Sequence, residues 1–505
     1  MIASAVPLRS EALRRRIVQT LSHRLDSDVT LEDLSLRVFP RFHAHASGLK
    51  IRQRGRTDVP PLISVDAFEV HGDAIGLWRK HVSSVRLSGL VISIPPDMDE
   101  DKDKGKDAEA QQRDEAQHDA RRGPAALDSA VIDTLDTEHA QLVIVPRKAD
   151  KRPKVWAIHN LRMHNVSGYQ SMPFRATLTN AVPPGEIETA GNFGPWNREH
   201  PGRTPLNGTF TFDKADLSVF KGIGGTLSAH GKFGGRLDWI EVDGNTNTPD
   251  FLVEVGGHPV PLQAKYRTVV DGTNGDTRLE RIDARFLEST IIASGAVLDG
   301  PKGEHGRTVS LDISMPQARI EDVMTLAVHT QKPVMTGALQ LSSKFLLPPG
   351  ETDVSQRLRL DGRFAIAAAM FTNYDVQGKI IELSHRGRGK KPDERKGNVA
   401  SDFAGRFRLM DGLLELPEVA FRVPGAQVRL TGRYALKPET LDFSGTMLMD
   451  AKVSETVTGW KSLLLKVADP LFSKRGGGSA IPIRIEGTRN EPKFGLDVRR
   501  VFRRQ

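Results

Sequence analysis

The chain has 505 residues, with 46 Gly, 30 Pro, no Cys and 6% aromatic residues, and its formal net charge is +8. This length exceeds one ordinary domain, so it indicates either several domains or one long repetitive architecture. The absence of Cys excludes disulfides, thiolate metal sites and Cys nucleophiles, and the Gly and Pro content favours many short strands over a helical bundle.

The first predicted element is an amphipathic helix from Ser10 to about Leu25. Leu13, Ile17 and Leu21 recur at helical spacing before Leu25, and Ser10 is a candidate N-cap. The opposite face is strongly basic. No window of the chain approaches the ~20 apolar residues of a membrane span, and the N-terminus lacks the apolar core of a signal peptide.

Extended segments with period-two alternation follow the helix. They include RVFPRFHAHASGLKIR, LISVDAFEV and HVSSVRLSGLVISI. The apolar parity changes at Gly48, because Ala44 and Ala46 share one face before it and Leu49 and Ile51 share a face after it. The same change occurs at Gly89. A bulge at each glycine would return all the apolar residues to one side of the sheet.

Residues 97–125 are highly charged and nearly free of large apolar groups, which predicts a disordered loop. A solvated helix over part of it is the alternative, because Ala, Glu, Gln and Arg are good helix formers. We therefore expect a helix at 1–26, a β module at 27–96, the loop at 97–125 and a continuing β region at 126–505. The last part of that region, 450–505, forms a closing segment.

Beyond the loop the dominant unit is Gly-x-apolar-x-apolar, as in GTFTF, GRFAI, GRFRL, GRYAL and GTMLM. Each unit predicts a glycine that opens a half-buried strand. A short helix is expected around Val376, Ile380 and Leu383, and a longer one from Val453 to Leu471. The predicted fold is mainly β: a long, twisted antiparallel sheet, curled into an elongated apolar groove because flat open sheets rarely exceed ~10 strands.

His43 and His45 would project from one strand face, a geometry in which two imidazoles can chelate zinc or copper. Their neighbours Ala44 and Ala46 occupy the apolar face, so we place the pair on the solvated face and predict no metal site. DGTNGDT resembles a calcium loop but lacks its ligand order, and Asn274-Gly275 indicates a hairpin turn instead.

No catalytic residue or cofactor site is predicted. A glycosidase carboxylate pair could be hidden in the sequence, but few aromatics are available to line a sugar cleft. Nucleic-acid binding is not expected, because the basic clusters are not interleaved with aromatic residues.

Two stretches of the sequence, one near each end of the chain, resemble a known family. The helix followed by DSDVTLEDLSLRVFPRFHAHASGLKIR and LISVDAFEVHGDAIGLWRKHVSSVRLSGLVISIP resembles the N-terminal module of the bacterial AsmA-like proteins, relatives of TamB. The C-terminal GGGSAIPIRIEGTRNEPKFGLDV is similar to the closing segment of that family. The resemblance implies a groove-shaped β-sheet at the periplasmic face of the bacterial inner membrane, within the cell envelope.

The resemblance further implies a role in phospholipid transport to, or maintenance of, the outer membrane. Phospholipids and the membrane surface are the expected partners, and other envelope proteins are compatible with it. Family members normally start with a transmembrane helix, which this sequence lacks, so we expect either a late start of the chain or attachment through the basic helix or partners.

The leading hypothesis is a non-enzymatic protein that shields acyl chains in its β-groove, with Arg14, Arg15 and Arg16 resting on anionic headgroups. Six apolar strand residues are candidates to line this groove, and they could equally form an ordinary protein core. A structural or adhesion-type β protein with a dry core is the alternative, and a carbohydrate-active enzyme is a weaker one. The candidate lining residues are Phe364, Ile366, Phe407, Leu409, Tyr434 and Leu436.

Overall fold

A computed structural model shows that the protein is mainly β, with 72% of the described residues in strands and 9% in helices. It describes residues 8–9, 11–37, 42–56, 58–73, 76, 81–94, 131–145, 153–197, 200–220, 222–254, 258–300, 306–327, 333, 335–350, 352, 354–372, 381, 384, 400–451, 479–488 and 491–496. The predicted loop at 97–125, the helix around Val376, Ile380 and Leu383, and the helix from Val453 to Leu471 lie outside these residues.

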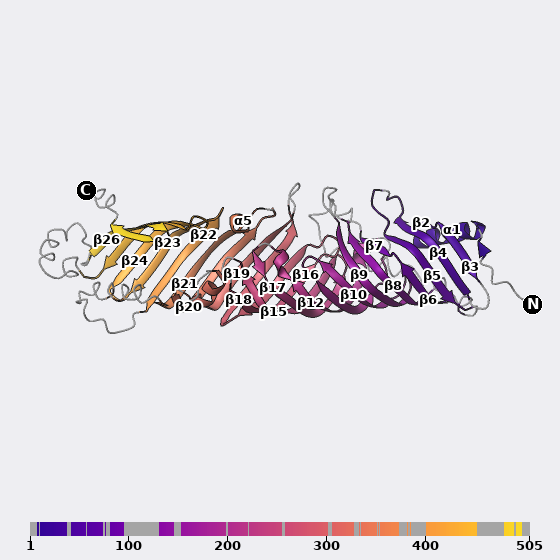
Figure 1. Cartoon of the computed structure of the whole chain (residues 1–505), viewed down its shortest axis with the longest axis horizontal. Coiled ribbons are helices and arrows are strands. Elements are labelled where there is room, and N and C mark those ends of the chain that lie inside the picture. Colours follow the sequence, from indigo (N-terminus) through magenta and orange to yellow (C-terminus); the bar gives the residue numbers. More distant parts are fainter. Residues whose placement is uncertain are drawn as a thin grey trace, which may run out of the picture. The chain divides into compact units, whose positions relative to one another are not determined.

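The chain divides into two compact units, coloured from indigo to magenta and from magenta to yellow in Figure 1. Unit 1 comprises Met1–Asp216, Ser228–Asn245 and Arg267–Thr277, and unit 2 comprises Leu217–Leu227, Thr246–Tyr266 and Arg278–Gln505. The expected N-terminal module and the first strands after the charged loop therefore belong to the same unit.

Unit 1 begins with a short strand and one helix, and strands follow. Its elements are β1 (Leu8–Arg9), α1 (Glu11–Leu25), β2 (Ser27–Thr30), β3 (Asp33–Arg37), β4 (Phe42–Gln53), β5 (Ile63–Gly72), β6 (His81–Ser88), β7 (Val91–Ile94), β8 (Val131–Ile144), β9 (Lys154–Val166), β10 (Met172–Ala181), β11 (Pro184–Phe193), η2 (Pro201–Arg203) and β12 (Pro205–Asp216).

Four strands contribute residues to both units. These are β14 (Thr226–Arg236), β15 (Trp239–Val253), β16 (Val260–Val270) and β17 (Thr277–Phe286). The remaining elements, in unit 2, are η3 (Leu217–Val219), β13 (Ile223–Gly224), β18 (Ser289–Asp299), β19 (Arg307–Arg319), α4 (Ile320–Ala327), β20 (Met335–Leu347), α5 (Val354–Arg357), β21 (Arg359–Phe371), β22 (Ser401–Met410), β23 (Leu413–Val423), β24 (Ala426–Ala435), β25 (Thr440–Met449), β26 (Ser479–Thr488) and β27 (Pro492–Leu496).

The strands pair mostly antiparallel with their neighbours in the chain, but the sheet is mixed. Strands β6 and β7 both pair with β8 in parallel, with His81 opposite Val131 and Val91 opposite Gln141. The prediction of an antiparallel sheet therefore holds for most of the pairings and is wrong at this place. The physical reason is the long charged segment before β8, which gives the chain the dozen or more residues that a parallel crossover needs.

The expected change of the buried face at Gly48 is confirmed, but the expected bulge is wrong. Ala44 and Ala46 are buried before Gly48, whereas Lys50 is exposed after it. The pairing of β4 with β5 continues through this point without an added residue. Gly48 instead has a φ of +67°, and Gly89 has a φ of +66°. Only glycine adopts this left-handed conformation freely, so it reverses the strand face without changing the register.

Helix α1 confirms the predicted N-terminal helix and covers one end of the apolar face of unit 1. Leu13, Ile17 and Val18 of α1 pack against a buried cluster that includes Leu34 and the fully buried Ala46. Glu11 lies in the first turn, where a negative charge is favourable to the helix dipole. The predicted N-cap, Ser10, lies outside the described residues.

Candidate functional site

The clearest candidate for a functional surface is the apolar face of strands β20 to β26 in unit 2, which lie side by side in Figure 1. The register places one apolar residue from each of the seven strands in a single row across the sheet. This row consists of Leu339, Ile366, Phe403, Phe421, Val428, Met447 and Ile481. We call it the apolar row, and at ~4.8 Å per strand it is roughly 29 Å long.

Five of the six predicted lining residues lie on the same face as the apolar row. Ile366 belongs to the row itself, and Phe364 lies two residues away on β21. Leu409 is paired with Leu414, which is in turn paired with Tyr434. Phe407 lies on this face of β22, with its ring centroid 6.4 Å from that of Phe364.

The sixth predicted residue, Leu436, does not lie in a strand. It follows the end of β24, in the turn before β25, and its backbone N–H donates to the carbonyl oxygen of Gly412 at 2.9 Å. Ile366 and Leu409 are buried at 6% and 7% exposure, whereas Phe364, Phe407, Tyr434 and Leu436 are half-buried. The structure therefore places five of the predicted residues on one face of the sheet. Two of them, Ile366 and Leu409, belong to the core, and the other three are partly accessible.

In the Gly-x-apolar-x-apolar units, the glycine of one strand packs against an aromatic ring of the neighbouring strand, and the aromatic ring of the first strand packs against the glycine of the second. Gly362 pairs with Phe407, and Phe364 pairs with Gly405, so each phenyl ring lies over the glycine of the neighbouring strand. A Cβ on Gly405 would lie 3.0 Å from the ring of Phe364 and 2.6 Å from the backbone oxygen of Glu418. Glycine leaves space that an aromatic ring from the next strand fills.

The same arrangement occurs in unit 1 between β12 and β14. A Cβ on Gly208 would lie 2.8 Å from the ring of Phe233, and a Cβ on Gly231 would lie 2.9 Å from the ring of Phe210. Both strands carry the spacing Gly-x-Phe, which is what an antiparallel pair needs for reciprocal contacts. The pattern is visible in the sequence, but the partner strand is not.

The opposite face of the same strands of unit 2 is charged. Directly opposed residues in β20 to β27 form a ladder of charges across the sheet, and we call this set the charge ladder. It consists of Lys344, Asp361, Arg408, Glu415, Arg433, Asp442, Glu486 and Lys493. Two of its ion pairs measure 3.1 Å, between Arg408 and Asp361, and 3.5 Å, between Arg433 and Asp442.

Exposed ion pairs of this kind contribute little stability, but like charges directly opposite each other are unfavourable. The one like-charged pair of the ladder, Asp442 opposite Glu486, is bridged by Arg484, which lies 3.6 Å from the first carboxylate and 2.5 Å from the second. A slip of one residue would also move the apolar row to the solvated face. The apolar row therefore favours this register, and six of the seven opposed pairs of the charge ladder, all except Asp442 with Glu486, agree with it, so the two faces of the sheet are chemically different.

Helix α4 covers part of the apolar face of unit 2. Its Val323, Met324 and Leu326 pack against a buried cluster that includes Leu339 and Ile366. Helix α4 contacts strands β19 and β20, at one side of the apolar row. This helix was not predicted, although apolar residues at helical spacing and two acidic residues in its first turn are visible in the sequence.

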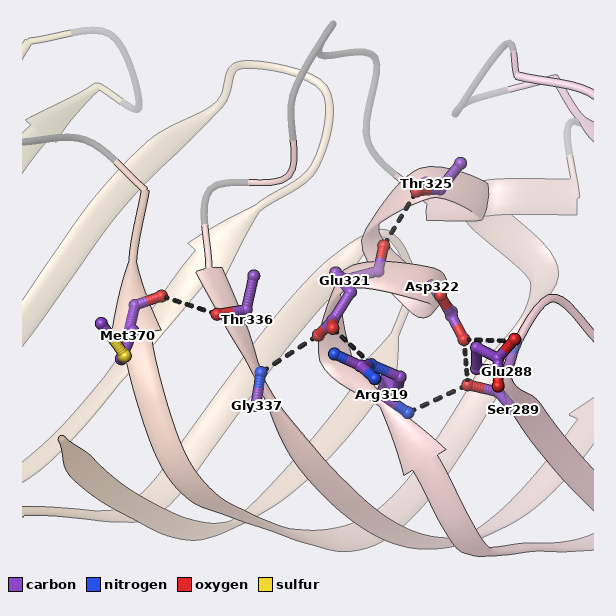
Figure 2. Close-up of polar contacts among 9 residues, drawn as sticks. All are labelled: Glu288, Ser289, Arg319, Glu321, Asp322, Thr325, Thr336, Gly337 and Met370. Atoms are coloured by element: carbon purple, nitrogen blue, oxygen red, sulfur yellow. Dashed lines mark hydrogen bonds and ion pairs between the residues drawn. The ribbon is translucent and has the colours of Figure 1, made fainter.

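A network of hydrogen bonds fixes the start of α4 to the sheet (Figure 2). One carboxylate oxygen of Asp322 accepts hydrogen bonds from the backbone N–H of Glu288 at 3.0 Å and from the hydroxyl of Ser289 at 2.7 Å. The Ser289 oxygen in turn accepts a hydrogen bond from the backbone N–H of Arg319 at 2.9 Å. Asp322 is 7% exposed and Ser289 is fully buried, so each of these groups depends on its protein partners.

Glu321, the neighbour of Asp322, joins α4 to β20. It accepts a hydrogen bond from the backbone N–H of Gly337 at 3.0 Å and one from the guanidinium of Arg319 at 2.5 Å. Burial by itself would raise the pKa of Glu321, but hydrogen bonds from backbone N–H groups and from Arg319 outweigh it, so the pKa is lowered. Glu321 is therefore held in its charged form at neutral pH.

The three predicted membrane-surface residues do not behave alike. Arg14 donates to the backbone oxygen of Leu31 and to the carboxylate of Glu11, and the bond to Glu11 raises the pKa of Arg14. Its side chain is 29% exposed, compared with 69% for that of Arg15. Arg16 is also exposed. Arg14 therefore attaches α1 to the sheet, and the other two remain accessible.

The histidine that lies against His43 is His71 of the neighbouring strand, and not His45. His43 and His71 are paired across β4 and β5, and their Nδ1 atoms are 3.3 Å apart. His45 is opposite Glu69. Sequence spacing did not indicate this pair, because the two histidines are brought together by strand register. Among the residues that the structure describes, no group of three or more His, Cys, Asp or Glu side chains could hold a metal ion.

Comparisons with family models, curated proteins and solved structures give no match. Within the described ranges, neither α1 nor another helix combines the length and the apolar character that crossing a bilayer requires.

Proposed function

We propose that the protein is a non-enzymatic lipid-handling protein of the bacterial cell envelope, in which a groove formed by the curled sheet shields phospholipid acyl chains. The observation that carries this proposal is the apolar row with its half-buried neighbours on one face of unit 2, opposite the charge ladder. The sequence resemblance to the AsmA-like proteins supports the same function, the periplasmic face of the inner membrane as its location, and transport to or maintenance of the outer membrane.

The physical argument is the cost of exposing a lipid tail to water. At ~0.8 kcal/mol per methylene, exposing an acyl chain of about 16 carbons costs on the order of 10 kcal/mol. A continuous apolar face that crosses many strands lowers this barrier at each step, whereas no chemical step needs to be catalysed. Half-buried residues such as Phe407 and Tyr434 have apolar area left to bury against a ligand.

Photo-crosslinking tests this proposal at single positions. We would replace Tyr434, on the apolar face, with the photoreactive residue benzoylphenylalanine, and compare it with the same replacement of Thr431, which is exposed on the opposite face of β24. After expression in a Gram-negative host and irradiation, mass spectrometry should detect phospholipid adducts at Tyr434 and not at Thr431.

Two outcomes would contradict the proposal. Crosslinks from Tyr434 to the chain itself, without lipid adducts and without lipid transfer between liposomes, would indicate a dry core and a structural β protein. Equal lipid labelling at both positions would indicate non-specific contact with membranes.

A further inference from the structure

The pair of histidines on the solvated face of unit 1 has its two Nδ1 atoms at a distance that fits either a long hydrogen bond or a shared metal ion. The Nδ1 atoms of His43 and His71 are 3.3 Å apart, and the rings are inclined at 75° with their centroids 4.6 Å apart. Hydrogen bonds donated by N–H groups are usually between 2.7 and 3.2 Å. The two nitrogens therefore face each other at a distance slightly longer than a good hydrogen bond.

We propose that His43 and His71 bind one Zn²⁺ ion through their Nδ1 atoms. Two imidazole nitrogens bound to zinc at ~2.0–2.1 Å with a tetrahedral angle lie about 3.3–3.4 Å apart, as the two Nδ1 atoms do, and zinc binding would turn the rings so that their centroids move from 4.6 Å to about 5.2 Å apart. In a square-planar site, as copper(II) prefers, adjacent nitrogens at a similar bond length would lie only about 2.8–2.9 Å apart. The distance thus favours a tetrahedral ion.

The surroundings supply what a two-histidine site needs. Glu69 lies 3.7 Å from Nε2 of His71, on the far side of the ring from Nδ1. At 3.7 Å the carboxylate is beyond hydrogen-bond distance, so it favours a proton on Nε2 through its charge alone, and that tautomer leaves Nδ1 for the metal. His71 is 47% exposed, so water can complete the coordination sphere.

Charged and polar groups on the neighbouring strands set the expected strength of the site. Arg37 of β3 is opposite His43, and Ser84 of β6 is opposite His71. The positive charge of Arg37 opposes metal binding, and the negative charge of Glu69 favours it. With two protein ligands, the site is expected to be weaker than a structural zinc site with four. This inference concerns unit 1 and is independent of the lipid proposal.

Equilibrium dialysis and isothermal titration with ZnCl₂ at neutral pH test the proposal on the full chain, expressed without a polyhistidine tag. We expect one zinc ion per chain, and at least a tenfold loss of affinity in both His43→Ala and His71→Ala. His45→Ala is the matched control, because His45 lies on the same strand and face, and it should stay within about twofold of the unmodified chain. Circular dichroism confirms that each variant is folded.

Cobalt substitution provides a second readout of the geometry. The visible absorption of Co²⁺ distinguishes four-coordinate from six-coordinate sites, and the proposal expects a four-coordinate spectrum that disappears in His71→Ala. The proposal is overturned if the unmodified chain binds no stoichiometric zinc, which would leave only a long ring-to-ring hydrogen bond. It is also overturned if His45→Ala loses as much affinity as His43→Ala.

Discussion

Removal of the Asp322 carboxylate should release α4 from the sheet of unit 2. Asp322→Ala leaves two donors without their acceptor, namely the backbone N–H of Glu288 and the hydroxyl of Ser289. Each buried donor left unsatisfied costs about 1–3 kcal/mol, so the expected loss is roughly 2–6 kcal/mol. Asp322→Asn keeps one acceptor oxygen at the same place, and its expected loss is about 1–2 kcal/mol.

Hydrogen exchange followed by mass spectrometry is the suitable assay, because α4 can open locally while the strands stay paired. A loss of 3 kcal/mol corresponds to exchange of the α4 amides that is on the order of 100-fold faster in Asp322→Ala. The effect in Asp322→Asn should be about tenfold. The amides of β24, which is far from α4 in the register of the sheet, should be unaffected.

Asp312→Ala is the matched control, since Asp312 is an exposed carboxylate on β19 that is opposite Lys344. It should change α4 exchange by less than about 0.5 kcal/mol. Unchanged α4 exchange in Asp322→Ala would refute the assignment of this network as the anchor. An equal effect of Asp312→Ala would show that general charge on the sheet, and not the buried acceptor, holds the helix.

Three further predictions address other parts of the chain. Gly405→Val should lower stability by about 1–3 kcal/mol in thermal unfolding, because its Cβ meets backbone, whereas Gly495→Val, with nothing within 4 Å of a Cβ, should have little effect. The lowered pKa of Glu321 means that its contribution to stability is complete above the ordinary glutamate range and is lost as pH falls through the lower folded value. The protection factors of the α4 amides, which correct for the slower intrinsic exchange in acid, should therefore fall in acid, and Glu321→Gln should flatten this dependence. Arg14→Ala should accelerate exchange of α1 roughly threefold to tenfold through the lost bond to the sheet, whereas Arg15→Ala should leave α1 exchange unchanged and weaken binding to anionic vesicles.

The sequence predicted correctly those structural features that depend on residues close together in the chain. The spacing of Leu13 and Ile17 predicted α1, and strand alternation predicted the shared face of Phe364, Ile366 and Phe407. These features depend on neighbours within a few residues, which the sequence displays directly. The change of face at Gly48 was predicted for the same reason.

Features that depend on register could not be predicted in this way. The bulge expected at Gly48 was wrong because β5 changes its buried side at the same point, and only the pairing shows this. His71 lies 28 residues after His43, so no spacing rule connects them. The parallel pairing of β6 with β8 and the reciprocal contact of Phe364 with Gly405 are long-range in the same sense.

The two described helices with apolar faces, α1 and α4, suggest where ligand contacts should be sought. Each helix packs against a buried cluster of its own unit, around Ala46 in unit 1 and around Leu339 in unit 2. Near the turn that follows β23, the fully buried Ser384 donates to the backbone oxygen of Pro424 at 2.8 Å.

Phe407 and Tyr434 are half-buried residues that lie on the part of the face nearer the opposite ends of these strands. A dry core would be expected to bury such aromatic side chains as completely as it buries Ile366, because their large apolar area makes exposure costly. The incomplete burial of Phe407 and Tyr434 therefore makes these two positions, and not the most buried ones, the sharpest places to distinguish a lipid-binding face from a self-packed core.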